Sequence, residues 1–262
     1  MKKTTADKLK TLIFVISIGL VFSGFQPARA NAPTDFKQAN DLYRAGKFVE
    51  AAKLYEGLSA GAADSERVLL FYNAANSYYR AGQINQAIWS YERALFINPW
   101  FSDARYNLKS VRSKIEYKIE DHRNVFMHVH DLALKWFKTA HLALAALIFS
   151  LIFLISSAFW FRNPNREHFW AFPRGEVFAA CLFFAVLCGA NYLYSQIYAE
   201  AIVLAAEAEV RYGPSMDNQS LMKLGGGLKV FVVDAREDWS RVVTWNGETG
   251  WIKNSELGRV DA

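Results

Sequence analysis

The pattern of hydrophobic and polar positions places two long apolar runs in the middle of the chain. Leu142–Phe161 and Val177–Tyr198 contain no Asp, Glu, Lys or Arg, and aromatic residues cluster at the ends of both runs. A helix of about 20 apolar residues spans the roughly 30 Å core of a bilayer, and aromatic rings collect at the headgroup level. The pattern therefore predicts a two-helix transmembrane hairpin, with helices at residues 140–161 and 177–198. Two core helices of a soluble protein are the alternative, but no other segment has enough apolar surface to cover them.

The first 30 residues have the pattern of a secretory signal peptide. Several lysines precede the apolar run Leu12–Phe22, and Ala28-Arg29-Ala30 fits an A-x-A cleavage site. An uncleaved anchor is the alternative. In both cases the residues from 31 onward are expected to be exported. The sequence thus predicts a two-pass protein of the bacterial inner membrane, with its N- and C-terminal domains in the periplasm.

The polar links on either side of the first apolar run fit this topology. The link at residues 162–176 contains three arginines, and it is expected in the cytoplasm because basic loops stay inside. Residues 122–139 are expected to join the N-terminal domain to the membrane.

Residues 31–121 contain an internal repeat of helical character. The segment ANDLYRAGKFVEAAKLYE from Ala39 is repeated as ANSYYRAGQINQAIWSYE from Ala75. The shared residues suit an antiparallel helix pair, with glycine where a helix ends at positive φ, alanine where helices cross, and tyrosine between them. They are Gly46 and Gly82, Ala51 and Ala87, Tyr55 and Tyr91, with Ala94 and Pro99 closing the second repeat. A third helix, Ser102 to about Glu120, is predicted to cover the end of the stack.

This repeat resembles the tetratricopeptide (TPR) family, in which a helix–turn–helix unit recurs about every 34 residues. The resemblance implies that the first helices of the repeats line a concave groove for a partner. The candidate groove residues are Asn40, Tyr43, Arg44, Asn73, Asn76, Tyr79, Arg80 and Asn107. Asparagine pairs with peptide backbone, and tyrosine adds contact area at low entropic cost. Ordinary polar contacts between helices are the alternative for these residues.

Residues 199–262 consist of short runs rich in Val and Trp between turn residues, which predicts a small antiparallel β-barrel. Asn246-Gly247 is a strong hairpin signal. The segment resembles the bacterial SH3-like domains at Val210-Arg211, Gly213-Pro214-Ser215 and Gly250-Trp251-Ile252. Such domains bind peptidoglycan, bind peptides or support a neighbour. The candidate ligand-facing residues are Arg211, Tyr212, Trp239, Trp245 and Trp251, with a core position as the alternative for at least one tryptophan.

The charge and the reactive side chains exclude several function classes. The net charge is +5, but the basic excess lies in the N-terminal segment and the membrane flanks, so we expect no nucleic-acid partner. Cys181 and Cys188 are two turns apart on one predicted helix, about 10 Å, too far for a disulfide. His122, His128 and His130 lack zinc-site spacing, and no nucleophile or phosphate-loop motif is present. We therefore expect no metal, no cofactor and no enzymatic activity.

The whole order of domains, a multidomain α plus β fold, resembles the TPR member of the Bacteroides aerotolerance group of envelope proteins. The resemblance implies a scaffold whose partners are von Willebrand A-domain proteins and a MoxR-type ATPase. The residues themselves leave two other functions open, a peptidoglycan-binding sensor and a subunit of a small oligomeric channel or transporter. Ala185 and Gly189 form a small-residue pair that is predicted to pack against the first span or another protein.

Overall fold

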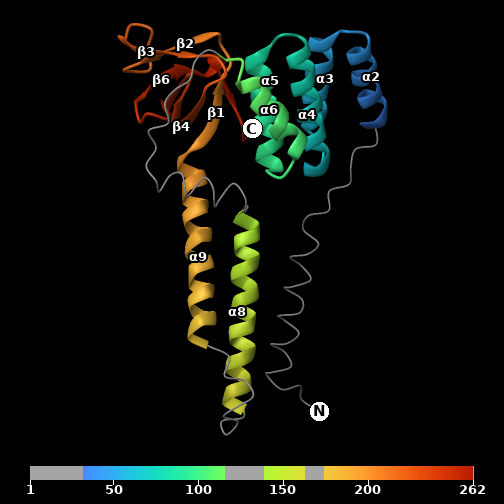
Figure 1. Ribbon diagram of the computed structural model, residues 1–262. Coiled ribbons are helices and arrows are strands. Elements are labelled where there is room, and N and C mark those ends of the chain that lie inside the picture. The colour runs from blue at the N-terminus through green and yellow to red at the C-terminus, as the bar shows by residue number, and fades with distance from the viewer. Residues whose placement is uncertain (1–31, 116–138, 163–173, 262) are drawn as a thin grey trace, which may run out of the picture.

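The chain folds into a stack of helices, a pair of long apolar helices and a C-terminal antiparallel sheet (Figure 1). The computed structural model describes residues 32–115, 139–162 and 174–261. The predicted signal peptide lies outside these residues. So do the three histidines, nearly all of the linker at residues 122–139 and most of the loop at residues 162–176.

Five helices form the helical stack. They are α2 (Ala32–Arg44), α3 (Phe48–Ser59), α4 (Asp64–Arg80), α5 (Ile84–Ile97) and α6 (Ser102–Arg112). Gly46 and Gly82 both have φ +77°, at the turns α2–α3 and α4–α5. At the first turn the Gly46 N–H donates to the Tyr43 carbonyl and the Lys47 N–H to that of Leu42, and the second turn repeats both bonds. This is the pattern of a helix that ends at a glycine, so the predicted role of the two glycines is confirmed.

The interior of the stack follows the repeat. Ala51 and Ala87 are fully buried where the helices cross, and Tyr55 and Tyr91 are buried between them. The predicted end of the third helix at about Glu120 is wrong, because α6 ends at Arg112. The chain leaves the helix there, and Ile115 packs against the cores of both the stack and the sheet.

Seven antiparallel strands form the C-terminal domain, called the barrel below. They are β1 (Ala199–Val203), β2 (Glu207–Arg211), β3 (Ser220–Gly225), β4 (Lys229–Arg236), β5 (Trp239–Val243), β6 (Thr249–Lys253) and β7 (Leu257–Arg259), in the order β3-β2-β6-β5-β4-β1-β7. Val210, Val230, Val242 and Ile252 from four of these strands share one buried cluster, so the sheet curves around a single core. The predicted hairpin is confirmed, because Gly247 at φ +85° lies in the turn between β5 and β6.

The two apolar runs form the helices α8 (Thr139–Arg162) and α9 (Arg174–Ile197), which pack antiparallel (Figure 1). Phe149 stacks on Phe184 at 5.4 Å between ring centroids, and Ser150 Oγ lies 3.0 Å from Cys181 Sγ. Among the described residues, Val177–Tyr194 is the stretch long and apolar enough to cross a membrane by length and composition, and the apolar stretch of α8 is shorter. That both helices cross a membrane therefore stays a prediction.

The small-residue pair of α9 does not contact α8. Ala185 and Gly189 are exposed, and a Cβ added at Gly189 would meet no atom within 4 Å. Of the two predicted contacts for this pair, the packing against the first span is therefore not formed.

Candidate interaction surfaces

The predicted groove asparagines join helices to one another. Asn40 Oδ1 accepts a hydrogen bond from the Tyr55 hydroxyl at 2.7 Å. Asn76 Oδ1 accepts bonds from the Tyr91 hydroxyl and from Asn107 Nδ2, the latter at 3.2 Å. These three asparagines therefore hold first helices to second helices and one repeat to the next, as the alternative interpretation of their role predicted.

Burial makes the loss of these inter-helix hydrogen bonds costly. Burial raises the pKa of Tyr91, with smaller contributions from neighbouring tyrosines, so its hydroxyl stays protonated and remains a donor. A buried acceptor that lost this donor would keep its desolvation cost without the bond. Replacing Asn76 would consequently disturb the fold as well as any surface that it borders.

Four other groove residues are accessible to a partner. Tyr43 and Tyr79 are half-buried, and Arg44 and Arg80 are exposed. The Lys114 ammonium lies 4.7 Å from the centre of the Tyr79 ring and contacts its hydroxyl. The remaining groove residue, Asn73, is half-buried, and its backbone carbonyl accepts a hydrogen bond from the Ser77 hydroxyl. The candidate groove residues thus comprise aromatic and cationic side chains beside asparagines that join the helices.

The barrel docks on one face of α5 (Figure 1). Asn85 Nδ2 donates to the carbonyls of Leu204 and Ala205, both at 3.1 Å, and Trp89 Nε1 donates to the Arg259 carbonyl at 2.7 Å. Asn85 and Trp89 are four residues apart and share a helix face. The two domains are therefore joined by hydrogen bonds from side chains of the stack to backbone of the barrel.

Two glycines of the barrel permit this approach. A Cβ on Gly226 would lie 2.0 Å from Asn85 Nδ2, and one on Gly258 would lie 2.9 Å from the Trp89 ring. Gly226 lies in the turn between β3 and β4. This turn is therefore also a contact site for the stack.

A buried ion cluster completes the junction. Lys229 on β4 is 6% exposed, and its Nζ lies 2.7 Å from Glu92 Oε2 on α5 and 2.6 Å from Glu200 Oε2 on β1. Burial by itself would lower the pKa of Lys229, but Glu200 and Glu92 outweigh burial and raise it, so the ammonium is charged. Arg112 of α6 binds the other oxygen of Glu92. Sequence reasoning missed this cluster, although a lysine inside the apolar run LKVFVV was its signal.

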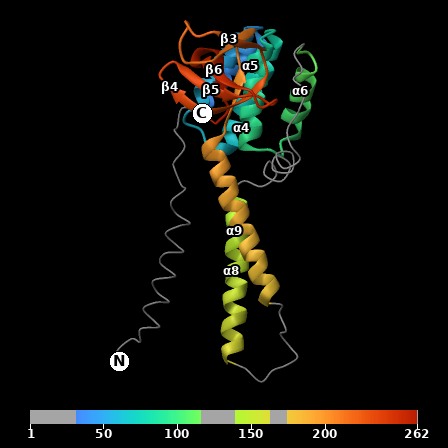
Figure 2. The same cartoon turned by 90° about the vertical axis from the view of Figure 1, so that its left-hand side faces the viewer.

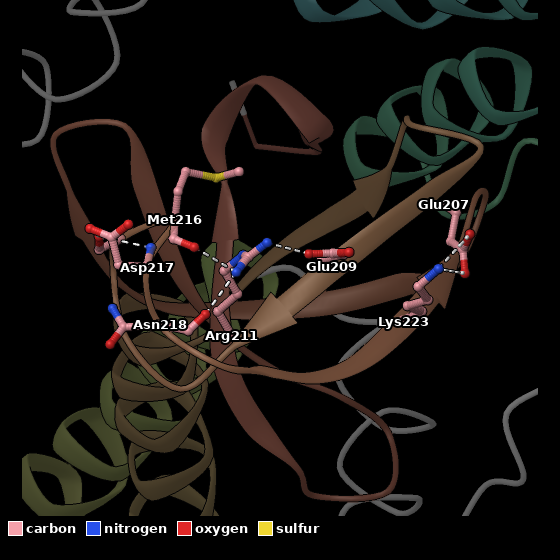
Figure 3. A network of polar contacts seen from close by, with 8 residues as sticks. Glu207, Glu209, Arg211, Met216, Asp217, Asn218 and Lys223 are labelled. Carbon is pink, nitrogen blue, oxygen red and sulfur yellow. Dashed lines mark hydrogen bonds and ion pairs between the residues drawn. The ribbon is translucent and has the colours of Figure 1, made fainter.

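On the barrel, Arg211 holds a loop in place (Figure 3). Its Nη1 donates to the carbonyls of Met216 and Asn218 at 2.8 and 2.7 Å, and its Nη2 binds Glu209. The loop at residues 212–219 presents Tyr212, which is 64% exposed. Arg211 therefore positions the loop.

The three candidate tryptophans differ in their surroundings. Trp251 is buried beneath Arg236, whose guanidinium carbon lies 5.3 Å from the ring centre. Trp245 packs edge-on against Phe231 at 5.0 Å, and Trp239 is half-buried. The core position expected for at least one tryptophan thus belongs to Trp251. Among the described residues of the barrel, Tyr212 and Met216 on the loop are the large hydrophobic side chains that are exposed.

The helix α9 continues into the barrel without a linker. The Tyr198 N–H donates to the Tyr194 carbonyl at 2.9 Å, and β1 begins at the next residue. The rings of Tyr194, Tyr198, Phe231 and Trp245 form a chain of contacts, with centroids 4.8, 6.1 and 5.0 Å apart. The orientation of the barrel relative to α9 is therefore set by packed aromatic side chains.

Residues 205–258 match the family model of the bacterial SH3 domain. The C-terminal sheet is thus a bacterial SH3 domain, a fold that binds proteins or cell-wall material in general. Comparison of the chain with curated proteins finds no match. Within the described residues, no group of three or more His, Cys, Asp or Glu side chains is placed to hold a metal ion.

Proposed function

We propose that this protein is a non-enzymatic, membrane-anchored adaptor whose helical stack and SH3 domain form one extracytoplasmic head. The observation that carries the proposal is the ion pair between Lys229 and Glu92 at the junction. This junction occupies α5, the second helix of its repeat, and Tyr43, Tyr79, Arg44 and Arg80 stay accessible on the first helices. The barrel thus supports the stack, and the stack offers the binding surface.

The arrangement of the apolar helices supports the anchoring. α8 and α9 run antiparallel, and both folded domains lie at the same end of the pair (Figures 1 and 2). An insertion of both helices across a bilayer would therefore leave the two domains on one side. With the predicted signal peptide, that side is the periplasm and the membrane is the bacterial inner membrane.

The repeat supports a protein partner. Its glycine, alanine and tyrosine positions have the structural roles of a TPR unit, a repeat whose stacked units form concave binding surfaces. The partners implied by the resemblance to the aerotolerance group, membrane-bound von Willebrand A-domain proteins and a MoxR-type ATPase, are themselves at the membrane. Shared anchoring would raise the effective concentration of a weak pair without new contacts.

Co-purification tests this function. The tagged full chain is solubilised from membranes, and the von Willebrand A-domain proteins and the MoxR-type ATPase of the same organism are quantified. We expect recovery from the natural chain and loss with Tyr79→Ala and Arg80→Ala together. The matched control is Glu50→Ala with Lys53→Ala, two exposed residues of α3, which should leave recovery unchanged. Equal recovery with both double variants, each with a normal melting curve, would show that the groove residues do not bind these partners.

Peptidoglycan is the second candidate ligand, and the match to the bacterial SH3 domain favours it. Sedimentation of the purified full chain with insoluble peptidoglycan tests it directly. Tyr212→Ala on the exposed loop should reduce binding, whereas Lys223→Ala, on the neighbouring strand β3, should not. If the natural chain does not sediment with peptidoglycan, the barrel does not bind this ligand, and only its role as a support for the stack remains.

A further inference from the structure

One end of the helical stack is apolar and exposed. Leu69 near the start of α4, Phe96 at the end of α5 and Trp100 in the α5–α6 connection are 53%, 52% and 58% exposed. Because α4 and α5 run antiparallel, these three side chains share one end of the stack, which we call the apolar end. The connection is held in place, since Asn98 Oδ1 accepts a bond from the Trp100 N–H at 3.1 Å and the Arg105 guanidinium donates to the Pro99 carbonyl.

The contacts at the junction fix the position of the apolar end along the axis of α9. Asn85 near the start of α5 binds the carbonyls that follow β1, whereas Glu92 meets Glu200 at the start of β1 through Lys229. The helix α5 therefore runs beside β1 in the opposite direction, toward α9. Phe96 is one helical turn beyond Glu92, about 6 Å, and Ile197, where α9 ends, is three residues before Glu200, about 10 Å.

The apolar end and the outer end of α9 consequently lie at about the same level. Figures 1 and 2 show this arrangement, with the α5–α6 connection on the side of the stack from which α8 and α9 extend. The end of α9 carries its own aromatic side chains, of which Tyr192 is 55% exposed. In a helix that crosses a bilayer, such tyrosines mark the headgroup level.

We propose that the apolar end of the stack inserts shallowly into the headgroup region of the bilayer that α8 and α9 cross. The inference rests on the membrane anchoring proposed above. Tryptophan and phenylalanine are side chains that enter this region. The junction with the barrel holds Phe96 and Trp100 at the level of the headgroups. The head would then have two attachments to the membrane, α9 beneath the barrel and the apolar end beneath the stack.

The charges beside the apolar end indicate which lipid it meets. Asp64 and Glu66 in the first turn of α4 and Asp103 in the first turn of α6 are exposed carboxylates at this end, where Arg67, which pairs with Asp64, and Arg105 add two positive charges. Carboxylates do not attract anionic headgroups, unlike the clusters of Lys and Arg that bind them. The insertion is therefore driven by apolar and aromatic surface, and it does not depend on anionic headgroups.

Depth-dependent fluorescence quenching tests the proposal in the full chain. Cys181 and Cys188 are replaced by alanine, one cysteine is introduced by Ser102→Cys beside Trp100, and an environment-sensitive dye is attached. The protein is reconstituted in phosphatidylcholine vesicles that contain lipids spin-labelled near the headgroup or deep in the acyl chain. We expect a blue-shifted emission and quenching by the shallow label, unchanged when part of the phosphatidylcholine is replaced by phosphatidylglycerol.

Two matched positions make the result decisive. A dye at Glu50→Cys, exposed at the opposite end of the stack, should show no lipid quenching, and one at Leu151→Cys on α8 should be quenched by the deep label. Phe96→Ser with Trp100→Ser should abolish the quenching at position 102 only. If position 102 behaves like position 50 while position 151 is quenched, the apolar end faces water or a protein, and the inference fails with the anchoring intact. If position 151 is not quenched, the anchoring and this inference both fail.

Discussion

Lys229 on β4 and Glu92 on α5 are 137 residues apart in the chain, and their side chains form a 2.7 Å ion pair at the junction of the two domains. Only 6% and 9% of these side chains are exposed. A buried charge that loses its partner is far more costly than a surface charge that does so. The stability of the head therefore depends on the stack and the barrel staying together.

Replacing the lysine tests this dependence. Lys229→Met leaves the Glu200 carboxylate without its cation and Glu92 with Arg112 alone, and we expect a loss of about 3–5 kcal/mol in the free energy of unfolding. Denaturant unfolding of the full chain in detergent measures it. Lys229→Met combined with Glu200→Met should recover part of the loss, because it removes the carboxylate that is left without a cation. A single variant as stable as the natural chain would show that the cluster does not hold the domains.

The close approach at Gly226 gives an independent test of the junction. Gly226→Ala places a methyl group 2.0 Å from Asn85 Nδ2 and 2.5 Å from the Ala205 carbonyl oxygen, so the barrel must shift away from α5. Overpacking of this kind costs about 1–3 kcal/mol. Gly57→Ala in α3 is the matched control, since its Cβ would meet nothing within 4 Å and should stabilise by about 0.5–1 kcal/mol. Melting curves that move in the same direction for both variants would contradict the docking.

The local parts of the fold were predictable, and the junction was not. Glycine at positive φ and alanine at a helix crossing are set by backbone geometry within a repeat, so Gly46 and Ala51 could be assigned from spacing alone. The junction joins segments more than a hundred residues apart, and neither Asn85 nor Lys229 has a neighbour in sequence that reveals its partner. The two interpretations of the groove asparagines could not be separated from the sequence for a related reason. An asparagine that bonds to a tyrosine of the next helix has the same spacing as one that faces a peptide.

The core of the barrel offers a test of the strand register. Ile252 on β6 is fully buried, and Ile252→Asp should unfold the barrel, because an unpaired charge in a core costs several kcal/mol. Thr249→Asp on the same strand is the control, since Thr249 is exposed. Near-identical unfolding curves for the two variants would mean that the strand does not present Ile252 to the core.

The proposed topology is testable by cysteine labelling after Cys181 and Cys188 are replaced. A cysteine at Asn165 should be shielded from a membrane-impermeant reagent in intact spheroplasts, because we place that position in the cytoplasm. Cysteines at Asp64 and Asn218 should both be labelled, since we place the stack and the barrel outside. Different labelling at Asp64 and Asn218 would rule out a two-pass arrangement.

The helical stack also contains a half-buried carboxyl group, that of Glu56 on α3. It accepts hydrogen bonds from the Tyr78 hydroxyl at 2.9 Å and the Ser90 hydroxyl at 3.1 Å. Burial raises the pKa of Glu56 above its ordinary value of 4.5, although these bonds and the charge of Arg93 oppose the rise. The ionised carboxylate is therefore less favourable in the folded stack than in the unfolded chain.

This shift sets the sign of a pH dependence. Because the folded state holds the Glu56 proton more tightly, the contribution of this group to stability rises as the pH falls through its raised pKa, and it is complete below 4.5. Glu56→Gln keeps an acceptor and cannot ionise, so we expect a higher melting temperature than the natural chain at neutral pH and a difference that shrinks in acid. Thermal unfolding of both proteins from neutral to acidic pH measures this, with Glu248→Gln in the exposed β5–β6 turn as the control. A Glu56→Gln variant that is less stable than the natural chain at neutral pH, by an amount that shrinks in acid, would show that the carboxylate is stabilised by its partners and that burial does not dominate.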